Sequence, residues 1–375
     1  MDHISEFDIR LEKEAYYAGE TIHGHVILHT TENFKLRSIR VSLRGQAHAE
    51  WKILVSGDRR SVKDDQYFVD DRLVIWGQDS SEGSVPILPR GKHQFPFRFN
   101  LPESALPCSF ESRTGCIRYY VKATVDRPYA SPPQGLKYFT LIGPHIDCMD
   151  EQYLVPIDKP MVGNEIYASC CFCCTRNPVE LSAQLERSAY VSGESIKLRA
   201  AIDNKGLEKA WLKVKLTQYV EFFIDRGVLG TSREQQKMVL EYKGDPVHPG
   251  STMKWDSGKT MVLPVCPPTL IGVCRLIQIY YVLKVSVEFE KAGEDLQMHF
   301  PLTVATVPFR IPNSIHQPQI KYDVAAEQVE GGCYIGPEFL LGQVYDGSDV
   351  TQPSALVLYR PVYVCTTNDW RGHGH

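Results

Sequence analysis

The densest group of chemically reactive side chains in the sequence is a run of four cysteines, Cys170, Cys171, Cys173 and Cys174. Their spacing contains two overlapping C-x-x-C pairs, which raises redox chemistry, zinc binding and S-palmitoylation as candidate roles. A thioredoxin-type pair requires a helix after it, and no helical period follows here. Four thiolates in so short a run cannot easily surround zinc tetrahedrally. Acylation therefore remains the functional alternative for this cluster.

The rest of the composition argues against an enzyme. The 375 residues include 11 cysteines, an odd number in a chain too long for a disulfide scaffold, so reduced thiols are expected. The motifs G-x-S-x-G, G-x-x-x-x-G-K-[ST] and H-E-x-x-H do not occur. Histidines and carboxylates are scattered without the spacing of metal ligands. We therefore expect no active site, no metal and no cofactor.

The charge and hydropathy of the chain bear on its partners. A net charge of -4 offers no general attraction to nucleic acid. No apolar run reaches the length of a membrane span, and the first residues enter a strand pattern without an apolar signal segment. These features predict a cytosolic protein that does not bind nucleic acid.

The elements that must position any functional side chain are short strands. Residues 95–101 and 117–125 each alternate apolar with polar side chains, which is typical of a half-buried strand. Leu101-Pro102 and Leu106-Pro107 interrupt the chain between them, and Gly115 permits the turn back. We expect Phe95, Phe97 and Phe99 to face the core.

An internal repeat indicates how these strands are organised. The pattern A-Y-x-x-G-E-[ST]-I occurs at residues 15–22 and again, 174 positions later, at 189–196. Further matches pair Ile39, Val41 and Leu43 with Leu212, Val214 and Leu216, and Tyr119-Tyr120-Val121 with Tyr280-Tyr281-Val282. A period this long indicates a duplicated domain rather than a solenoid. Its short alternating strands predict β-sandwiches, and only residues 232–243 leave a helix open.

The stretch from Gly91 to Pro128 resembles the α-arrestins, the arrestin-domain-containing proteins. Those proteins carry G-x-H-x-FPF-x-F-x-LP, LP-x-SFE, G-x-IRY-x-VKA and DRP in this order, and this stretch fills the whole pattern. The resemblance covers roughly the first 313 residues. It implies an all-β protein with two arrestin-like immunoglobulin-type β-sandwich domains and a flexible C-terminal tail. We expect an N-domain at 5–145, an inter-domain segment at 146–177, a C-domain at 178–313 and a largely disordered tail with short motifs at 314–375.

The tail departs from the family pattern. α-Arrestins typically carry P-P-x-Y motifs there, whose polyproline II turns bind WW domains of HECT-type ubiquitin ligases. Here Gly342 and Gln343 replace both prolines before Tyr345, and Arg360-Pro361-Val362-Tyr363 keeps one proline of a second motif. Because a stacked proline is lost, we expect weakened WW-domain binding.

Basic side chains on polar strand rows are the candidate contacts for partners. They are Arg40, Arg44, Arg118 and Lys122 on predicted strands, their counterparts Lys213 and Lys215 in the second repeat, and Arg59, Arg60 and Lys63 on a predicted loop. In arrestins the concave faces and loop tips meet the partner, so the resemblance implies contact with acidic or phosphorylated cytoplasmic tails or with anionic lipid. For each residue alone, a solvated sheet face is the simpler alternative.

Cysteines can also be interpreted through the resemblance. Cys274 lies where one member of the family has a thioredoxin-linking cysteine, but it begins an apolar strand pattern and is better interpreted as a small buried hydrophobe. Cysteine-rich runs like that at 170–174 occur at this position in α-arrestins. We therefore favour reduced thiols in a strand that enters the C-domain.

The resemblance implies a non-enzymatic adaptor that links receptors and transporters to endocytic sorting, protein transport and ubiquitin-ligase machinery. Such a protein would be cytoplasmic, with recruitment to the plasma membrane or endosomes and peripheral membrane association. One alternative is a redox- or thioredoxin-linked metabolic regulator acting through Cys274. Another is an endosomal trafficking subunit of the retromer type, whose fold is also arrestin-like. The FPF and IRY motifs favour the α-arrestins.

Overall fold

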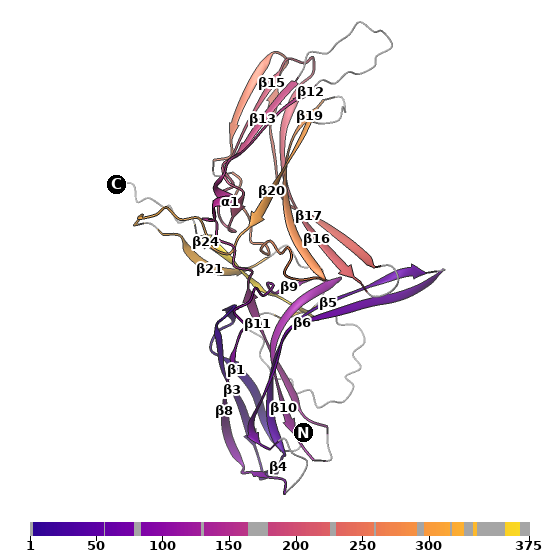
Figure 1. Ribbon diagram of the computed structural model, residues 1–375, viewed down its shortest axis with the longest axis vertical. Helices are drawn as coiled ribbons and strands as arrows, with labels where there is room; N and C mark the ends of the chain where they lie inside the picture. Colours follow the sequence, from indigo (N-terminus) through magenta and orange to yellow (C-terminus); the bar gives the residue numbers. More distant parts are fainter. Residues whose placement is uncertain are drawn as a thin grey trace.

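The computed structural model shows two β-sandwich domains stacked end to end, with the tail at the waist between them (Figure 1). It describes residues 3–55, 57–78, 84–128, 131–163, 179–225, 230–258, 260–290, 296–315, 317–325, 333–335 and 357–367. Within this part of the chain the only α-helix is α1 (Glu151–Leu154). No described helix has the length and apolar character needed to cross a membrane.

The N-domain consists of two packed sheets. The first has the order β1-β3-β8 and contains β1 (Ile4–Leu11), β3 (Thr21–Thr30) and β8 (Gly91–Asn100). The second has the order β2-β11-β10-β5-β6, with β9 paired to β10; its strands are β2 (Ala15–Tyr17), β5 (Ser38–Val55), β6 (Asp58–Gly77), β9 (Phe110–Glu111), β10 (Gly115–Asp126) and β11 (Gln134–Ile142). A short pair, β4 (Phe34–Lys35) and β7 (Ile87–Leu88), lies beside them.

The C-domain repeats this arrangement. One sheet has the order β12-β13-β15-β18, formed by β12 (Ile157–Gly163), β13 (Val179–Leu185), β15 (Leu198–Asn204) and β18 (Ser251–Asp256). The other has the order β14-β20-β19-β16-β17, formed by β14 (Ala189–Tyr190), β16 (Ala210–Ile224), β17 (Thr231–Val247), β19 (Ile277–Phe289) and β20 (Leu296–Val304). Residues 232–243 are therefore strand, and β12, in the expected inter-domain segment, pairs with the C-domain sheet.

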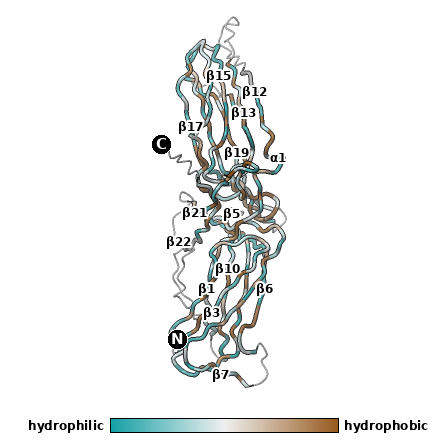
Figure 2. The backbone as a smooth tube through the Cα atoms, turned by 90° about the vertical axis from the view of Figure 1, so that its left-hand side faces the viewer, coloured by the Kyte–Doolittle hydropathy of each residue, from teal (hydrophilic) through white to brown (hydrophobic). Residues whose placement is uncertain are grey.

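The cores form as the alternation predicts. Phe95, Phe97 and Phe99 are all buried, and the ring of Phe97 occupies the space above Gly24, where a Cβ atom would lie 2.4 Å from it. Hydropathy alternates along the strands of both domains (Figure 2). One hydrophobic cluster runs without a break through both domains, so their interface is part of the core.

Two equivalent tyrosine hydrogen bonds show the repeat, and they correct the sequence match by one residue. The Tyr119 hydroxyl donates to the carbonyl of Pro107 at 2.9 Å, and the Tyr281 hydroxyl donates to that of Pro267 at 2.6 Å. The sequence match of Tyr119 with Tyr280 is therefore wrong by one residue. Successive strand residues point to opposite faces, so Tyr280 faces outward and donates to Glu221.

Short segments of the tail form strands. β21 (Gln319–Val324) and β24 (Val362–Thr367) form an antiparallel pair at the waist, and β22 (Cys333–Ile335) pairs with β23 (Val357–Tyr359). Within the expected tail, Gln319–Val324 and Val362–Thr367 are therefore strands. The apolar residues of β24 are buried on both faces of the strand between the two domains, and this burial stabilises the strand there.

Candidate functional site

Four of the basic candidates share one sheet surface, which we call the basic face: Arg40, Arg44, Arg118 and Lys122. Arg118 and Lys122 alternate with buried residues on β10, and Arg40 and Arg44 do so on the neighbouring strand β5. Their side chains point away from the β1-β3-β8 sheet, because the inward positions of both strands fill the core. The structure thus places the four side chains on one face of the sheet, with Lys122 and Arg44 close enough to interact.

Two of these cations are already neutralised. Arg118 forms a bidentate ion pair with Glu111, with Nε–Oε2 at 2.8 Å and Nη2–Oε1 at 2.6 Å. Although burial alone would lower the pKa of Arg118, the Glu111 carboxylate holds it above its ordinary value. Arg40 lies 3.4 Å from the carboxylate of Asp126. These two residues build the face rather than offer free charge.

Arg44 is partly compensated. Its Nη2 donates to Asp70 Oδ1 at 3.1 Å, and its guanidinium carbon lies 5.5 Å from the ring centroid of Tyr67, a cation–π distance. Arg44 and Asp70 are both partly open to solvent, so this pair exchanges easily with other anions.

Lys122 is the least compensated cation of the basic face. Among the residues that the structure describes, it makes no ion pair with a carboxylate. Partial burial lowers the pKa of Lys122, and the positive charge of Arg44 lowers it further. The rings of Tyr120 and Tyr138, in edge contact at 5.6 Å, lie on the same side of the sheet. An ammonium group held in this way gains free energy when an anion approaches.

On the corresponding surface of the C-domain, the two lysines of β16 are compensated. Lys213 lies 3.4 Å from Glu288 and 3.5 Å from Glu241, and Lys215 lies 3.3 Å from Glu241. These carboxylates neutralise the lysines of β16.

The other basic candidates lie elsewhere. Arg59, Arg60 and Lys63 were predicted on a loop, but they belong to β6, because β5 and β6 continue as a long hairpin beyond the sandwich (Figure 1). All three are exposed near the hairpin end. Leu54 stands opposite Arg59 and is 71% exposed.

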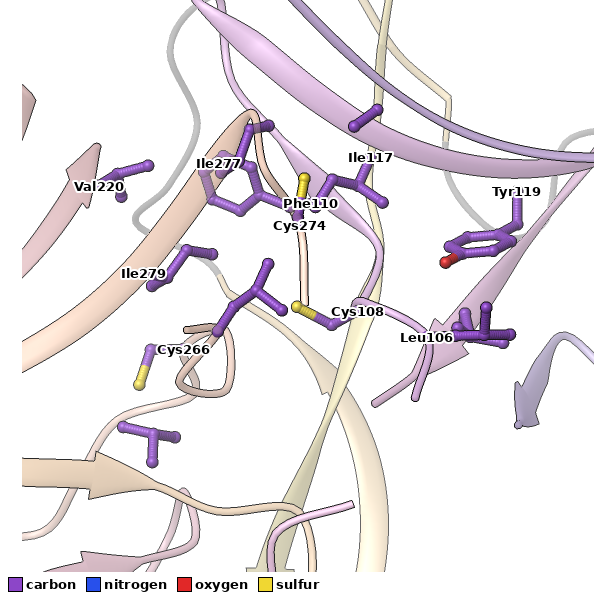
Figure 3. Close-up of a cluster of buried hydrophobic side chains, with 14 of the residues drawn as sticks. Leu106, Cys108, Phe110, Ile117, Tyr119, Val220, Cys266, Cys274, Ile277 and Ile279 are labelled. Carbon is purple, nitrogen blue, oxygen red and sulfur yellow. The ribbon is translucent and has the colours of Figure 1, made fainter. Parts of the chain in front are cut away.

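Cys274 lies inside the domain interface. It is 2% exposed, and its thiol donates to Gln66 Oε1 at 3.6 Å. Figure 3 shows it in an apolar cluster near Cys108, Phe110 and Ile277. Burial raises the pKa of the Cys274 thiol. A thiol that is buried and protonated reacts poorly, so its position agrees with the interpretation as a small hydrophobe.

Sequence reasoning missed Arg275, the residue that follows Cys274. The backbone N–H of Arg275 donates to Gln66 at 2.9 Å, and its Nη1 donates to Asp64 Oδ2 at 2.8 Å. Arg275 thereby joins the C-domain to β6 of the N-domain. In the sequence it is an ordinary surface charge, and no local pattern could have revealed its partner.

The remaining candidates divide between described and undescribed residues. Cys170, Cys171, Cys173, Cys174 and Tyr345 lie outside the described residues. Arg360, Pro361, Val362 and Tyr363 lie at the domain interface, where Tyr363 is 4% exposed. Six described cysteines are unpaired and buried: Cys108, Cys116, Cys148, Cys266, Cys274 and Cys365. In the described part of the chain, no three metal-ligating side chains are grouped to hold a metal.

Two duplicated sandwiches that share a core across a waist are the architecture of the arrestins. Comparison with known families agrees: the arrestin (S-antigen) N-terminal domain matches residues 5–147, and the arrestin C-terminal domain matches residues 175–309. The chain belongs to the arrestin family. This family is non-enzymatic, and its members act as adaptors.

Similar proteins place the chain among the α-arrestins. It is 32% identical to human arrestin domain-containing protein 4 over 306 residues, covering 79% of this chain and 69% of that protein. It is 26% identical to arrestin domain-containing protein 17 of Caenorhabditis elegans, covering 85% of this chain and 74% of that protein. It is 22% identical to human thioredoxin-interacting protein, covering 94% and 90%.

Proposed function

We propose that this adaptor binds an acidic or phosphorylated cytoplasmic segment of a receptor or transporter on the basic face and links it to endocytic sorting, protein transport and ubiquitination. The observation that carries the proposal is Lys122, a half-buried ammonium group beside Arg44 that has no carboxylate partner among the described residues. A half-buried ammonium group without a carboxylate partner attracts anions rather than cations.

The chemistry of the basic face suits a phosphate or a carboxylate. An anion beside Lys122 relieves its repulsion with Arg44 and forms charge-assisted hydrogen bonds, which are roughly twice as strong as neutral ones. Arg44 can leave Asp70, a partly exposed partner, at little cost. The rings of Tyr120 and Tyr138, in contact with each other on this face, offer apolar contact to such a group.

The test is a titration of the full chain with one acidic peptide in phosphorylated and unphosphorylated forms. Lys122→Glu places a carboxylate where the ligand anion would bind, and about tenfold weaker binding, or 1.4 kcal/mol, is expected. Arg98→Glu is the matched control, because Arg98 is exposed on β8 in the opposite sheet. Equal affinities of the two variants would refute the basic face as the site.

The cellular setting is part of the same proposal. We propose that the protein works in the cytoplasm, with recruitment to the plasma membrane or endosomes, and that acylation of Cys170, Cys171, Cys173 and Cys174 is one means of peripheral attachment. The exposed hairpin end with Arg59, Arg60 and Lys63 offers a second contact for anionic lipid. Acyl exchange on the purified protein, before and after hydroxylamine, tests the first. Flotation with anionic and neutral vesicles tests the second.

A WW-domain ubiquitin ligase is the proposed second partner, through Arg360-Pro361-Val362-Tyr363. A thioredoxin link through Cys274 is less favoured, since the thiol is buried at the domain interface. Measuring whether thioredoxin forms a mixed disulfide with the folded chain, but not with Cys274→Ser, separates this alternative.

A further inference from the structure

The strands β21 and β24, which we call the tail pair, touch both domains. Tyr322 of β21 places its hydroxyl 3.0 Å from that of Tyr17 in the N-domain. On β24, the N–H of Val362 donates to Thr140 Oγ1 at 3.2 Å, and the N–H of Thr366 donates to the carbonyl of Ser192 at 2.8 Å. One end of β24 is therefore held by the N-domain and the other by the C-domain.

The surface against which β24 packs is apolar, in addition to forming hydrogen bonds with the strand. A small enclosed cavity at this point is bounded by Leu141 and Ile142 of the N-domain, by Cys266 and Pro268 of the C-domain, and by Val362 and Tyr363 of the tail. Tyr363, Val364 and Cys365 are all buried there. Consecutive residues of one strand are thus covered on both faces, which is the environment of a core strand and not of a peripheral tail.

The same segment contains the remaining WW-ligand motif. A WW domain binds a polyproline II segment whose proline and tyrosine lie on its aromatic surface. Here Pro361 is buried, and Tyr363 pairs with Asp323 across the tail pair. Because Pro361 and Tyr363 are buried and residues 362 and 363 are paired in the strand, the motif cannot lie on a WW domain while β24 is at the interface.

We propose that the domain interface and a WW domain compete for Arg360–Tyr363, so that a HECT-type ubiquitin ligase binds this chain only after β24 has left the interface. The competition rests on the ligase link proposed above. Because β24 contacts both domains, its release also removes a connection between them. Ligase recruitment would then report the state of the domain interface.

The expected effect follows from the released fraction. A ligand that binds only the released state has an apparent Kd equal to its intrinsic Kd divided by the population of that state. If about one molecule in ten or fewer is released, the full chain binds at least about tenfold more weakly than the isolated segment. The segment alone has no interface to occupy and gives the intrinsic Kd.

The experiment compares a 355–370 peptide with the full chain, both carrying Arg360→Pro to restore the second proline. Residue 360 precedes the paired residues of β24, so proline there removes no ladder hydrogen bond. Each is titrated with the isolated WW domain of a HECT-type ligase. We expect the peptide to bind at least about tenfold more tightly than the full chain.

A release variant completes the test. Cys365 is buried and lies outside the motif, so Cys365→Asp expels β24 without altering Arg360–Tyr363. In the full chain it should raise the affinity to that of the peptide, whereas in the peptide it should change nothing. Hydrogen exchange gives a readout without a ligase: the amide of Thr366 should be protected in the wild type and unprotected in Cys365→Asp.

Three results would overturn the proposal. If the full chain and the peptide bind equally, the interface does not mask the motif, although the ligase link stands. If the Arg360→Pro peptide does not bind, the competition fails together with the ligase link, while the cargo site on the basic face is untouched. If the Thr366 amide is unprotected in the wild type, β24 is not seated at the interface.

Discussion

The two copies of the A-Y-x-x-G-E turn share one backbone geometry but lie in different surroundings. In the N-domain the N–H of Tyr17 donates to Glu20 Oε2 at 3.0 Å, and in the C-domain the N–H of Val191 donates to Glu194 Oε2 at 2.8 Å. The glutamate carbonyls accept from Leu101 and from Leu263, each at 2.9 Å. The motif therefore encodes the same turn twice.

The difference lies in what covers each turn. The N-domain pair Lys13–Glu20 has side chains 53% and 33% exposed, whereas the C-domain pair Arg187–Glu194 has side chains 9% and 11% exposed. The Arg187 guanidinium also lies 4.0 Å from the Tyr190 ring centroid and 4.8 Å from that of Phe309. The N-domain copy of the motif is a surface turn, and the C-domain copy is buried near the domain interface.

Removing the basic partner of each pair should give the largest contrast. Arg187→Ala leaves Glu194 buried without its cation, which costs about 3–5 kcal/mol of unfolding free energy. Lys13→Ala removes an exposed contact and should leave stability unchanged within error. Urea unfolding of both variants measures the difference. If the two variants unfold at the same urea concentration, the buried pair has no special role.

Substituting the two turn glycines should give a smaller contrast. Gly19 and Gly193 have φ angles of 81° and 88°, so alanine is strained at both positions. An added Cβ at Gly193 would lie 2.2 Å from the carbonyl oxygen of Thr366, whereas at Gly19 the nearest atom is Glu103 Cγ at 3.5 Å. Gly193→Ala should therefore cost about 1–3 kcal/mol more than Gly19→Ala, as overpacking does.

Hydrogen exchange shows whether this extra cost arises at β24. The amides of 362–367 should lose protection in Gly193→Ala and keep it in Gly19→Ala. Equal protection in the two variants would contradict the contact between the C-domain turn and the tail.

Replacing the equivalent tyrosines Tyr119 and Tyr281 should give a smaller difference in stability. Tyr119 makes one hydrogen bond, whereas the Tyr281 hydroxyl also accepts from the Gln218 amide at 2.6 Å. Tyr281→Phe removes an acceptor from the buried Gln218 amide, and the cost should be about 1–3 kcal/mol against about 1 kcal/mol for Tyr119→Phe. Thermal unfolding of the two variants compares these costs. A larger loss in Tyr119→Phe would reverse the comparison.

Alkaline pH should lower the stability of both domains alike. The change in unfolding free energy per residue is the smallest of these effects. Burial raises the pKa of Cys108 to about 12 and that of Cys266 to about 11. Unfolded thiols ionise near pH 8.5 while the native ones stay protonated, so each thiol contributes stability that is complete below that pH and declines above it. From pH 8 to pH 9 the loss is about 0.7 kcal/mol per thiol. Cys108→Ala and Cys266→Ala should each reduce the pH slope by this amount; an unchanged slope would indicate an ionised native thiol.

Strand alternation predicted most of the fold, and it did so because burial has the period of the strand. The row of Phe95, Phe97 and Phe99 shows this clearly, and so does the placement of Lys122 on an outer face. The register error at Tyr280 has the same physical origin. Two adjacent tyrosines look alike in a sequence, but only the inward one can reach the proline carbonyl.

Features that depend on distant partners were not predictable. The apolar run of β24 becomes a buried strand only because Leu141 and Cys266, far apart in the sequence, meet at the interface. Likewise, nothing local distinguishes Lys122, which lacks a carboxylate among the described residues, from Arg118, which has Glu111. Alternation identifies the face of a side chain but not its neighbours across the sheet.

The long hairpin of β5 and β6 has a consequence for solubility. β6 is the last strand of its sheet, so over much of its 20 residues its outer backbone groups lack a neighbouring strand. Such an edge can template the addition of another chain. The charged residues along β6, including Arg59, Arg60, Asp70 and Asp71, repel a second identical strand in parallel register. The cations for which we propose a contact with anionic lipid thus also help to keep the protein from aggregating edge to edge.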